Sequence, residues 1–143
     1  MVTDASLWVN YFLPRNRWHR ESREWLGRQL EAGRALVAPD LLLAEVGGAV
    51  SRATGWPELG RRAVRRLRDW PGLEVVSEEN LALEAALLAC DLGLRGADTF
   101  YVLVARQRTL PLISWDDDQR DRARALVPVG RPGDKLLWPD GDR

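Results

Sequence analysis

Short apolar segments alternate with longer amphipathic segments along the whole chain. The short segments predict strands at residues 1–3, 35–38, 73–76, 110–114 and 127–129. The longer segments carry apolar residues at helical spacing and predict helices at residues 7–13, 17–33, 41–54, 58–69, 77–92, 98–108 and 116–126. Strands that alternate with helices in this way are typical of an α/β fold, in which helices cover a parallel sheet.

Capping and turn residues define the ends of several segments. Asp40 is suited to begin the third predicted helix, and Gly93 is suited to end the fifth. The end of the chain is rich in Gly, Pro and Asp, and Trp138 is the expected anchor of this segment. We therefore expect one domain over residues 1–130 and a loop-rich tail over residues 131–143.

Length and charge limit the function classes. A chain of 143 residues is long enough for one domain with a hydrophobic core and too short for two. It carries 21 Lys and Arg against 21 Asp and Glu, so it has no net charge that would draw it to nucleic acid. A polyanionic substrate must therefore be bound by local features.

Cysteine usage and hydropathy indicate the compartment. Cys90 is the only cysteine, and its neighbours Leu87, Leu88 and Leu92 predict a small buried apolar residue rather than a disulfide partner. No segment approaches the ~18 apolar residues that a membrane span needs, and no basic region precedes an apolar one at the N-terminus. We expect a soluble cytoplasmic protein that does not enter the membrane.

Three acidic residues are expected at one edge of the sheet. Asp4 follows the first predicted strand and Asp116 follows the fourth. Ligands in open α/β sheets bind beyond the carboxyl ends of the strands, so both side chains should reach that edge. Asp98 lies in the first turn of a predicted helix and should face the same rim.

A fourth acid, Glu45, lies in an otherwise apolar helix that reads LLLAEVGGAV. An ionised carboxylate in such surroundings needs a partner, and several acids brought together repel one another until some take up protons. A divalent cation removes that conflict. Oxygen ligands alone select hard cations such as Mg²⁺ or Mn²⁺, and such a site suits phosphoryl chemistry.

Four segments, taken in order and with their spacing, resemble the PIN-domain nucleases. They are residues 2–6 (VTDAS), 43–46 (LAEV), 96–101 (GADTFY) and 112–116 (LISWD). The likeness extends from Asp4 to about Ala123 and is greatest to the VapC-type toxins of bacterial and archaeal toxin–antitoxin pairs. It implies a PIN-like three-layer sandwich, whose central parallel sheet of four or five strands has helices on both faces.

The resemblance also implies an activity. Proteins of this type are Mg²⁺- or Mn²⁺-dependent endoribonucleases that cut single-stranded or looped RNA and leave a 5′-phosphate. A cognate antitoxin holds them inactive, and they form a homodimer partly through helices near the middle of the chain. We therefore expect an RNA substrate, an antitoxin protein and a second copy of the chain as partners.

Each acid matches one position of the family pattern. Asp4 matches its first acid and Asp98 its third, which implies direct metal ligation by both. Glu45 matches the helix-borne glutamate, which helps to bind the metal or to orient the water. Asp116 matches the more variable fourth acid, which often acts through water.

Further residues are expected in supporting roles. Ser6 and Ser114 match small hydroxyl residues that hydrogen-bond the acids or a phosphate. Asp118 is a candidate outer acid, although an Asp there also suits a helix N-terminus. The arginine-rich helix offers Arg61, Arg62 and Arg65 as contacts for RNA phosphates, and its alternative role is a solvated face.

Other interpretations remain open at the level of sequence. Asp and Glu commonly serve as helix caps or solvated loop residues. A noncatalytic PIN-like module could bind RNA or protein through the same surface. A phosphatase with Asp4 as nucleophile usually needs a second Asp two residues on, where Ser6 stands. His19, the only histidine, is expected at the surface, and most of the seven tryptophans in the core or a dimer interface.

Overall fold

The computed structural model describes residues 1–77 and 81–134. Its strands are β1 (Val2–Thr3), β2 (Leu36–Pro39), β3 (Leu73–Val76), β4 (Leu112–Ile113) and β5 (Val129–Gly130). Its helices are α1 (Ala5–Phe12), α2 (His19–Glu31), α3 (Leu41–Thr54), α4 (Pro57–Arg68), α5 (Ala82–Leu92), α6 (Gly96–Arg108) and α7 (Asp117–Ala123). Most of the predicted tail, with Trp138, lies outside the described residues.

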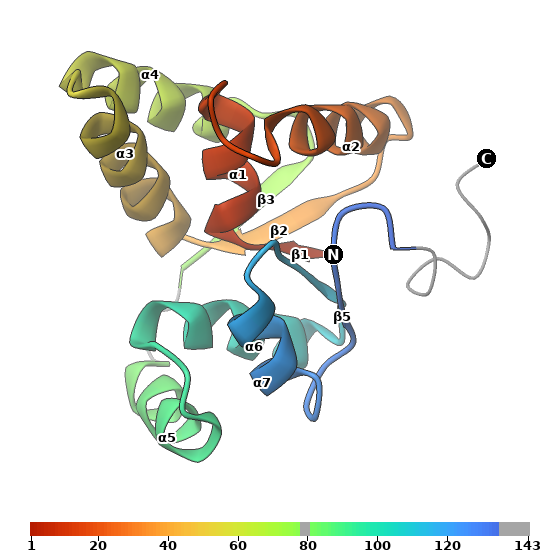
Figure 1. Cartoon of the computed structure of the whole chain (residues 1–143). Coiled ribbons are helices and arrows are strands. Elements are labelled where there is room, and N and C mark those ends of the chain that lie inside the picture. The colour runs from red at the N-terminus through yellow and green to blue at the C-terminus, as the bar shows by residue number, and fades with distance from the viewer. Residues whose placement is uncertain (78–80, 135–143) are drawn as a thin grey trace.

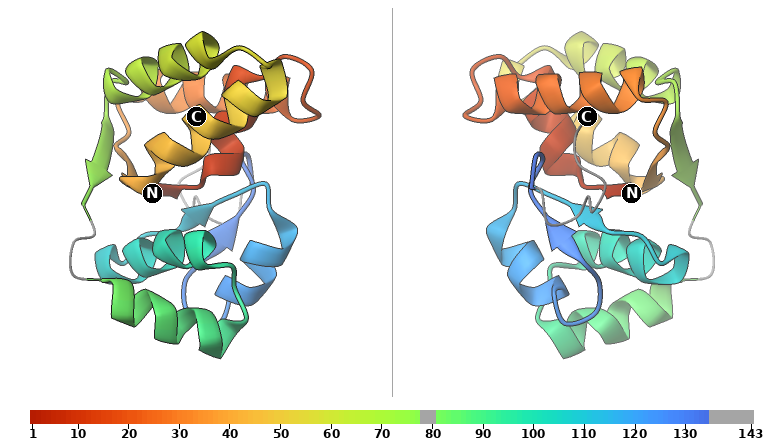
Figure 2. Two further views of the ribbon diagram at one scale, coloured as in Figure 1. Left: turned by 90° about the vertical axis from the view of Figure 1, so that its left-hand side faces the viewer. Right: turned by 90° about the vertical axis from the view of Figure 1, so that its right-hand side faces the viewer.

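The strands form one parallel sheet in the order β3-β2-β1-β4-β5. Helices α1 to α4 lie on one side of this sheet, and α5 to α7 lie on the other (Figure 1). The side views show the same three layers (Figure 2). The predicted α/β sandwich, with a parallel sheet of four or five strands between helices, is thereby confirmed.

The central strands are shorter than their apolar segments. Strand β4 was expected over residues 110–114, but only Leu112 and Ile113 have ladder geometry. Pro111 contributes its carbonyl oxygen, which accepts a hydrogen bond of 2.9 Å from the amide of Val2, and it has no N–H with which to continue the ladder. Strand pairing therefore begins after the proline.

Large aromatic side chains fill the core beside the central strand. Trp8 is fully buried and donates from Nε1 to Thr3 Oγ1 over 3.0 Å. Its ring meets that of Trp70 edge-on at a centroid distance of 5.0 Å. Such pairs add about 0.5–1.5 kcal/mol beyond area burial, so Trp8 fixes the direction in which α1 leaves the sheet.

Helices α3 and α4 approach closely because each has a glycine at the contact. A Cβ on Gly60 would lie 2.5 Å from the backbone oxygen of Gly47 and 2.0 Å from Ser51 Oγ. Any larger residue at position 60 would force the two helices apart. Pro57 in the first turn and Gly55, at φ 73°, make the tight connection between them.

Two predictions for helix α5 are wrong. Cys90, predicted to be buried, is exposed, because α5 buries only Ala85 and Leu88 and Cys90 lies on another face. The helix also begins at Ala82 rather than near Ser77, and residues 78–80 lie outside the described residues. The exposed face of α5 is therefore more apolar than a solvated helix requires.

One further surface expectation needs correction. His19 is half-buried, and its Nδ1 lies 2.8 Å from the backbone oxygen of Asn10, so the side chain joins the ends of α1 and α2. Of the tryptophans, Trp8 and Trp25 are buried and Trp56 is 69% exposed, so the placement of most tryptophans in the core or a dimer interface stays a prediction. No helix among the described residues is both long enough and apolar enough to cross a bilayer.

Candidate active site

Asp4 is held by the start of helix α1. The strand β1 ends one residue earlier, and Asp4 caps the helix by accepting a hydrogen bond of 2.9 Å from the amide of Ser6 at Oδ2. The same oxygen accepts from Ser114 Oγ over 3.0 Å, and Oδ1 accepts from Gln119 Nε2 over 3.3 Å. With 4% of its surface exposed, Asp4 has a fixed orientation.

The topology brings the loop after β4 to the same place. Strand β1 pairs with β2 on one side and with β4 on the other, so the strand order changes direction here. Crevices at such points are the usual ligand sites of open α/β sheets. The amide of Asp4 donates to the Ile113 carbonyl over 3.0 Å, which ties the ends of β1 and β4 together.

Two serine hydroxyls link Asp4 to Asp116. Ser6 Oγ lies 3.3 Å from Ser114 Oγ, which in turn accepts a hydrogen bond of 2.9 Å from the amide of Asp116. Ser6 Oγ also accepts from the amide of Trp115 over 3.0 Å. The structure thus brings both predicted serines to the acids, where they orient the carboxylate and the loop.

Glu45 reaches the site from α3 and is oriented by Tyr101. The fully buried Tyr101 donates its hydroxyl proton to Glu45 Oε2 over 2.6 Å. Burial raises the pKa of Glu45, the Tyr101 hydrogen bond opposes this, and the nearby charges of Asp4 and Asp98 raise the pKa further. Burial also raises the pKa of Tyr101 well above its ordinary value of 10.0, so Tyr101 remains a proton donor.

Asp98 and Asp116 share one arginine. Arg95 donates from Nε to Asp98 Oδ2 over 2.7 Å, and its terminal nitrogen forms an ion pair with Asp116 Oδ2. Burial raises the pKa of Asp98, and the Arg95 guanidinium partly offsets that rise. Asp116 Oδ1 also caps α7 through a hydrogen bond of 3.0 Å from the amide of Gln119.

Gln119 is a site residue that the sequence patterns did not identify. Its side chain is fully buried, and Nε2 lies 3.3 Å from Asp4 Oδ1 and 3.4 Å from the backbone oxygen of Asp98. Its Oε1 is buried and has no hydrogen-bond partner among the described residues. An acceptor left open beside two acids suits a water or ion at this position.

The donor chemistry of the site suits a hard cation. The candidate ligands are all oxygens, and burial and mutual repulsion raise the pKa of both Glu45 and Asp98. However, within residues 1–77 and 81–134 no three acidic, histidine or cysteine side chains stand at metal-ligand spacing. Asp4 lies close enough to Glu45 and Asp98 for its charge to raise the pKa of both, and Arg95 pairs with Asp98 and Asp116. Binding of an ion by the four acids stays a prediction.

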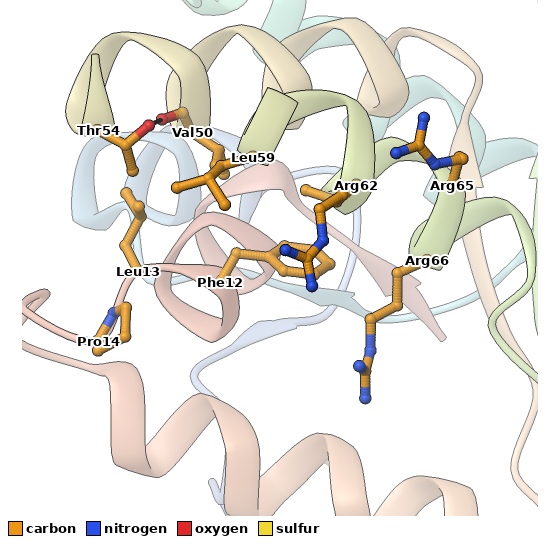
Figure 3. A pocket seen from close by; sticks show the side chains of 10 residues that line it. Phe12, Leu13, Pro14, Val50, Thr54, Leu59, Arg62, Arg65 and Arg66 are labelled. Carbon is orange, nitrogen blue, oxygen red and sulfur yellow. Dashed lines mark hydrogen bonds between the residues drawn. The ribbon is translucent and has the colours of Figure 1, made fainter. Parts of the chain in front are cut away.

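Other predicted residues contact groups outside the four acids. Asp118 is exposed and accepts from Arg122 Nε over 2.8 Å. Arg61 and Arg65 both pair with Glu58, at 3.4 and 2.6 Å. Arg62 lines a pocket at the C-terminal ends of α1 and α3, whereas Asp4 and Glu45 belong to the N-terminal ends of these helices (Figure 3).

The raised pKa of Glu45 predicts a pH-dependent stability. A carboxyl group whose pKa is raised on folding binds protons more tightly in the folded protein, so stability falls as pH rises above its ordinary pKa of 4.5. In metal-free buffer, Glu45→Gln should therefore raise the melting temperature at pH 7, and the gain should shrink below about pH 4.5.

Thermal melts of the two proteins across this pH range check the expectation. The exposed Glu84 of α5 provides the control, since Glu84→Gln replaces a carboxylate that already lies in solvent and should change the melting temperature little. A gain for Glu45→Gln that is equal at pH 4 and pH 7 would contradict the role of burial.

Comparisons with known proteins agree with this geometry. The family model described as PIN domain matches residues 1–125. The crystal structure of PAE2754 from Pyrobaculum aerophilum is similar, with a TM-score of 0.66 and 16% sequence identity over 89% of this chain and 81% of that one. A search of curated protein sequences finds no significant match. This chain belongs to the PIN-domain family, a family of metal-dependent nucleases.

Proposed function

We propose that this protein is a cytoplasmic, Mg²⁺- or Mn²⁺-dependent endoribonuclease that acts as the toxin of a toxin–antitoxin pair. One observation carries the proposal: buried Asp4 lies near Glu45 and Asp98, and Arg95 joins Asp98 to Asp116 at the same edge of the sheet. Family membership supports the nuclease activity. The RNA substrate and the toxin role are inferred from the resemblance of the four acidic segments.

Asp4, Asp98 and Asp116 would hold the ion, and Glu45 would complete the site. When bound, the ion would supply an activated water and would neutralise negative charge at the reacting phosphate. Tyr101 keeps the Glu45 carboxylate turned toward the other acids through its hydrogen bond of 2.6 Å. Glu45 would also help to orient the attacking water.

The activity can be tested on a short RNA that contains a single-stranded loop. Cleavage products with a 5′-phosphate should appear with Mn²⁺ or Mg²⁺ and should be absent when EDTA is in excess. Cleavage that persists in EDTA would contradict the metal-dependent mechanism. The noncatalytic binding module predicts a different result, namely RNA or protein binding with no Mn²⁺ binding in calorimetry.

We further propose a homodimer that uses the exposed face of α5. Leu83, Leu87 and Cys90 lie at helical spacing along this face, and the two leucines are 73% and 59% exposed. Removing apolar surface from water stabilises an interface by about 25 cal/mol per Å². An exposed apolar face of this kind therefore favours association with a second protein surface. A second copy of the chain is the occupant that the family resemblance implies.

Leu87→Glu is therefore expected to convert the dimer to a monomer in sedimentation analysis. In the dimer the Cys90 thiol should react slowly with a thiol reagent, and in the variant it should react at the rate of an exposed cysteine. Glu84→Gln, on the same helix, should leave the oligomeric state unchanged. A monomeric wild-type protein would refute this interface.

We propose that the antitoxin binds a groove at the C-terminal ends of α1 and α3. The apolar side chains Phe12, Leu13 and Leu59 line one part of a pocket, and arginines 62, 65 and 66 lie beside them (Figure 3). An acidic segment with apolar anchors would match both features. The proposal predicts that an adjacent reading frame encodes a small DNA-binding protein, which should inhibit cleavage when the two are purified together.

A further inference from the structure

The side chain of Arg95 brings a cation to the acid site. Arg95 precedes helix α6, and its guanidinium spans from Asp98 in that helix to Asp116 at the start of α7. The two carboxylates are 12% and 28% exposed, whereas the arginine side chain is 66% exposed. The two carboxylate charges are thus neutralised by a group that enters from the solvent side.

We propose that Arg95 is the internal counter-ion of the site, that it gives way to the divalent ion, and that it then binds a phosphate of the RNA. The inference rests on the proposed function and adds a substrate-contacting residue to it. Arg95 would alternate between two kinds of anion, a carboxylate pair in the metal-free protein and a phosphodiester in the loaded one.

The first step follows from competition for the same oxygens. Arg95 occupies Asp98 Oδ2 and Asp116 Oδ2, which are among the oxygens that a metal ion would need. A guanidinium and a divalent cation repel each other when they share ligands. Metal binding must therefore displace at least part of this contact.

The second step follows from how Arg95 is attached. Its backbone is anchored, because the Arg95 carbonyl accepts from the amide of Thr99 over 3.2 Å and from Thr99 Oγ1 over 3.0 Å. Only the exposed side chain has to move. A guanidinium has two parallel N–H donors that match two oxygens of a phosphate. The Arg95 side chain already reaches two of the acids that would hold the metal, so it could contact a phosphate bound there.

Metal affinity tests the counter-ion role without any cleavage. In calorimetric titration with Mn²⁺, Arg95→Gln should bind about tenfold more tightly than the wild-type protein, because a competing cation has been removed. Arg124→Gln is the matched control: Arg124 has a similar exposure of 64% and pairs with the exposed Asp121, away from the four acids. Its Mn²⁺ affinity should equal that of the wild type.

Steady-state cleavage of a short single-stranded RNA at saturating Mn²⁺ tests the phosphate role. Arg95→Gln should raise KM about tenfold with little change in kcat, and Arg95→Lys should recover part of the loss. Equal Mn²⁺ affinities of the wild type and Arg95→Gln would overturn the counter-ion role, and an unchanged KM would overturn the phosphate contact. If the wild type binds no Mn²⁺, the proposed function itself fails.

Discussion

Asp4→Asn is expected to lower RNA cleavage by about 10³-fold or more and to abolish Mn²⁺ binding. Asparagine can still accept the capping hydrogen bond from the amide of Ser6, so α1 should begin at the same residue. It removes the negative charge, however, and with it the fixed anchor of the ion. Cleavage assays and Mn²⁺ calorimetry check the loss of activity and of metal binding. A thermal melt checks that the fold is retained.

The control for this experiment is Asp118→Asn. Asp118 is an exposed acid that pairs with Arg122 rather than with the four acids, so its loss should leave cleavage unchanged. Asp98→Asn should behave like Asp4→Asn, since both acids would ligate the metal. Undiminished cleavage by the double variant of Asp4 and Asp98 would refute the mechanism.

Gly60→Ala is expected to destabilise the fold by about 1–3 kcal/mol, which is the usual cost of overpacking a close contact. The added methyl group would lie 2.5 Å from the Gly47 oxygen, so α3 and α4 would have to separate. Glu45 belongs to α3, and its position relative to Tyr101 should change as well. Denaturant unfolding and cleavage rates should both report the change.

Gly27→Ala is the matched control for this substitution. Gly27 lies within α2, and an added Cβ there would meet nothing within 4 Å. Alanine is a better helix former than glycine, so this variant should gain about 0.5–1 kcal/mol. A Gly60→Ala protein as stable as Gly27→Ala would show that the helices can separate without cost.

Local patterns were sufficient for most of the fold. Helical periodicity predicted residues 41–54 and the apolar segment 73–76 predicted a strand, with the bounds that α3 and β3 have. The end of a strand is also a local signal, and it predicted that Asp4 and Asp116 meet at one edge of the sheet. The surface of α5 was not predictable in this way, because apolar spacing does not tell a core from an unpartnered face.

The remaining site residues depend on contacts between distant parts of the chain. Gln119 meets Asp4 across 115 positions, and Tyr101 meets Glu45 across 56. Arg95 directly precedes the segment GADTFY, yet nothing local indicates that its side chain crosses to α7. Such partners become visible only when the sheet order is known, since the order decides which loops lie together.

The hydrogen bonds around Asp4 have a consequence for how the protein responds to chelators. Its carboxylate is oriented by a helix start, by Ser114 and by Gln119, all of which are contacts within the polypeptide. Order at this aspartate is thus completed during folding, before any ion arrives. A sample stripped with EDTA should keep the backbone of α1 intact, and returning the metal should restore full cleavage without a refolding step.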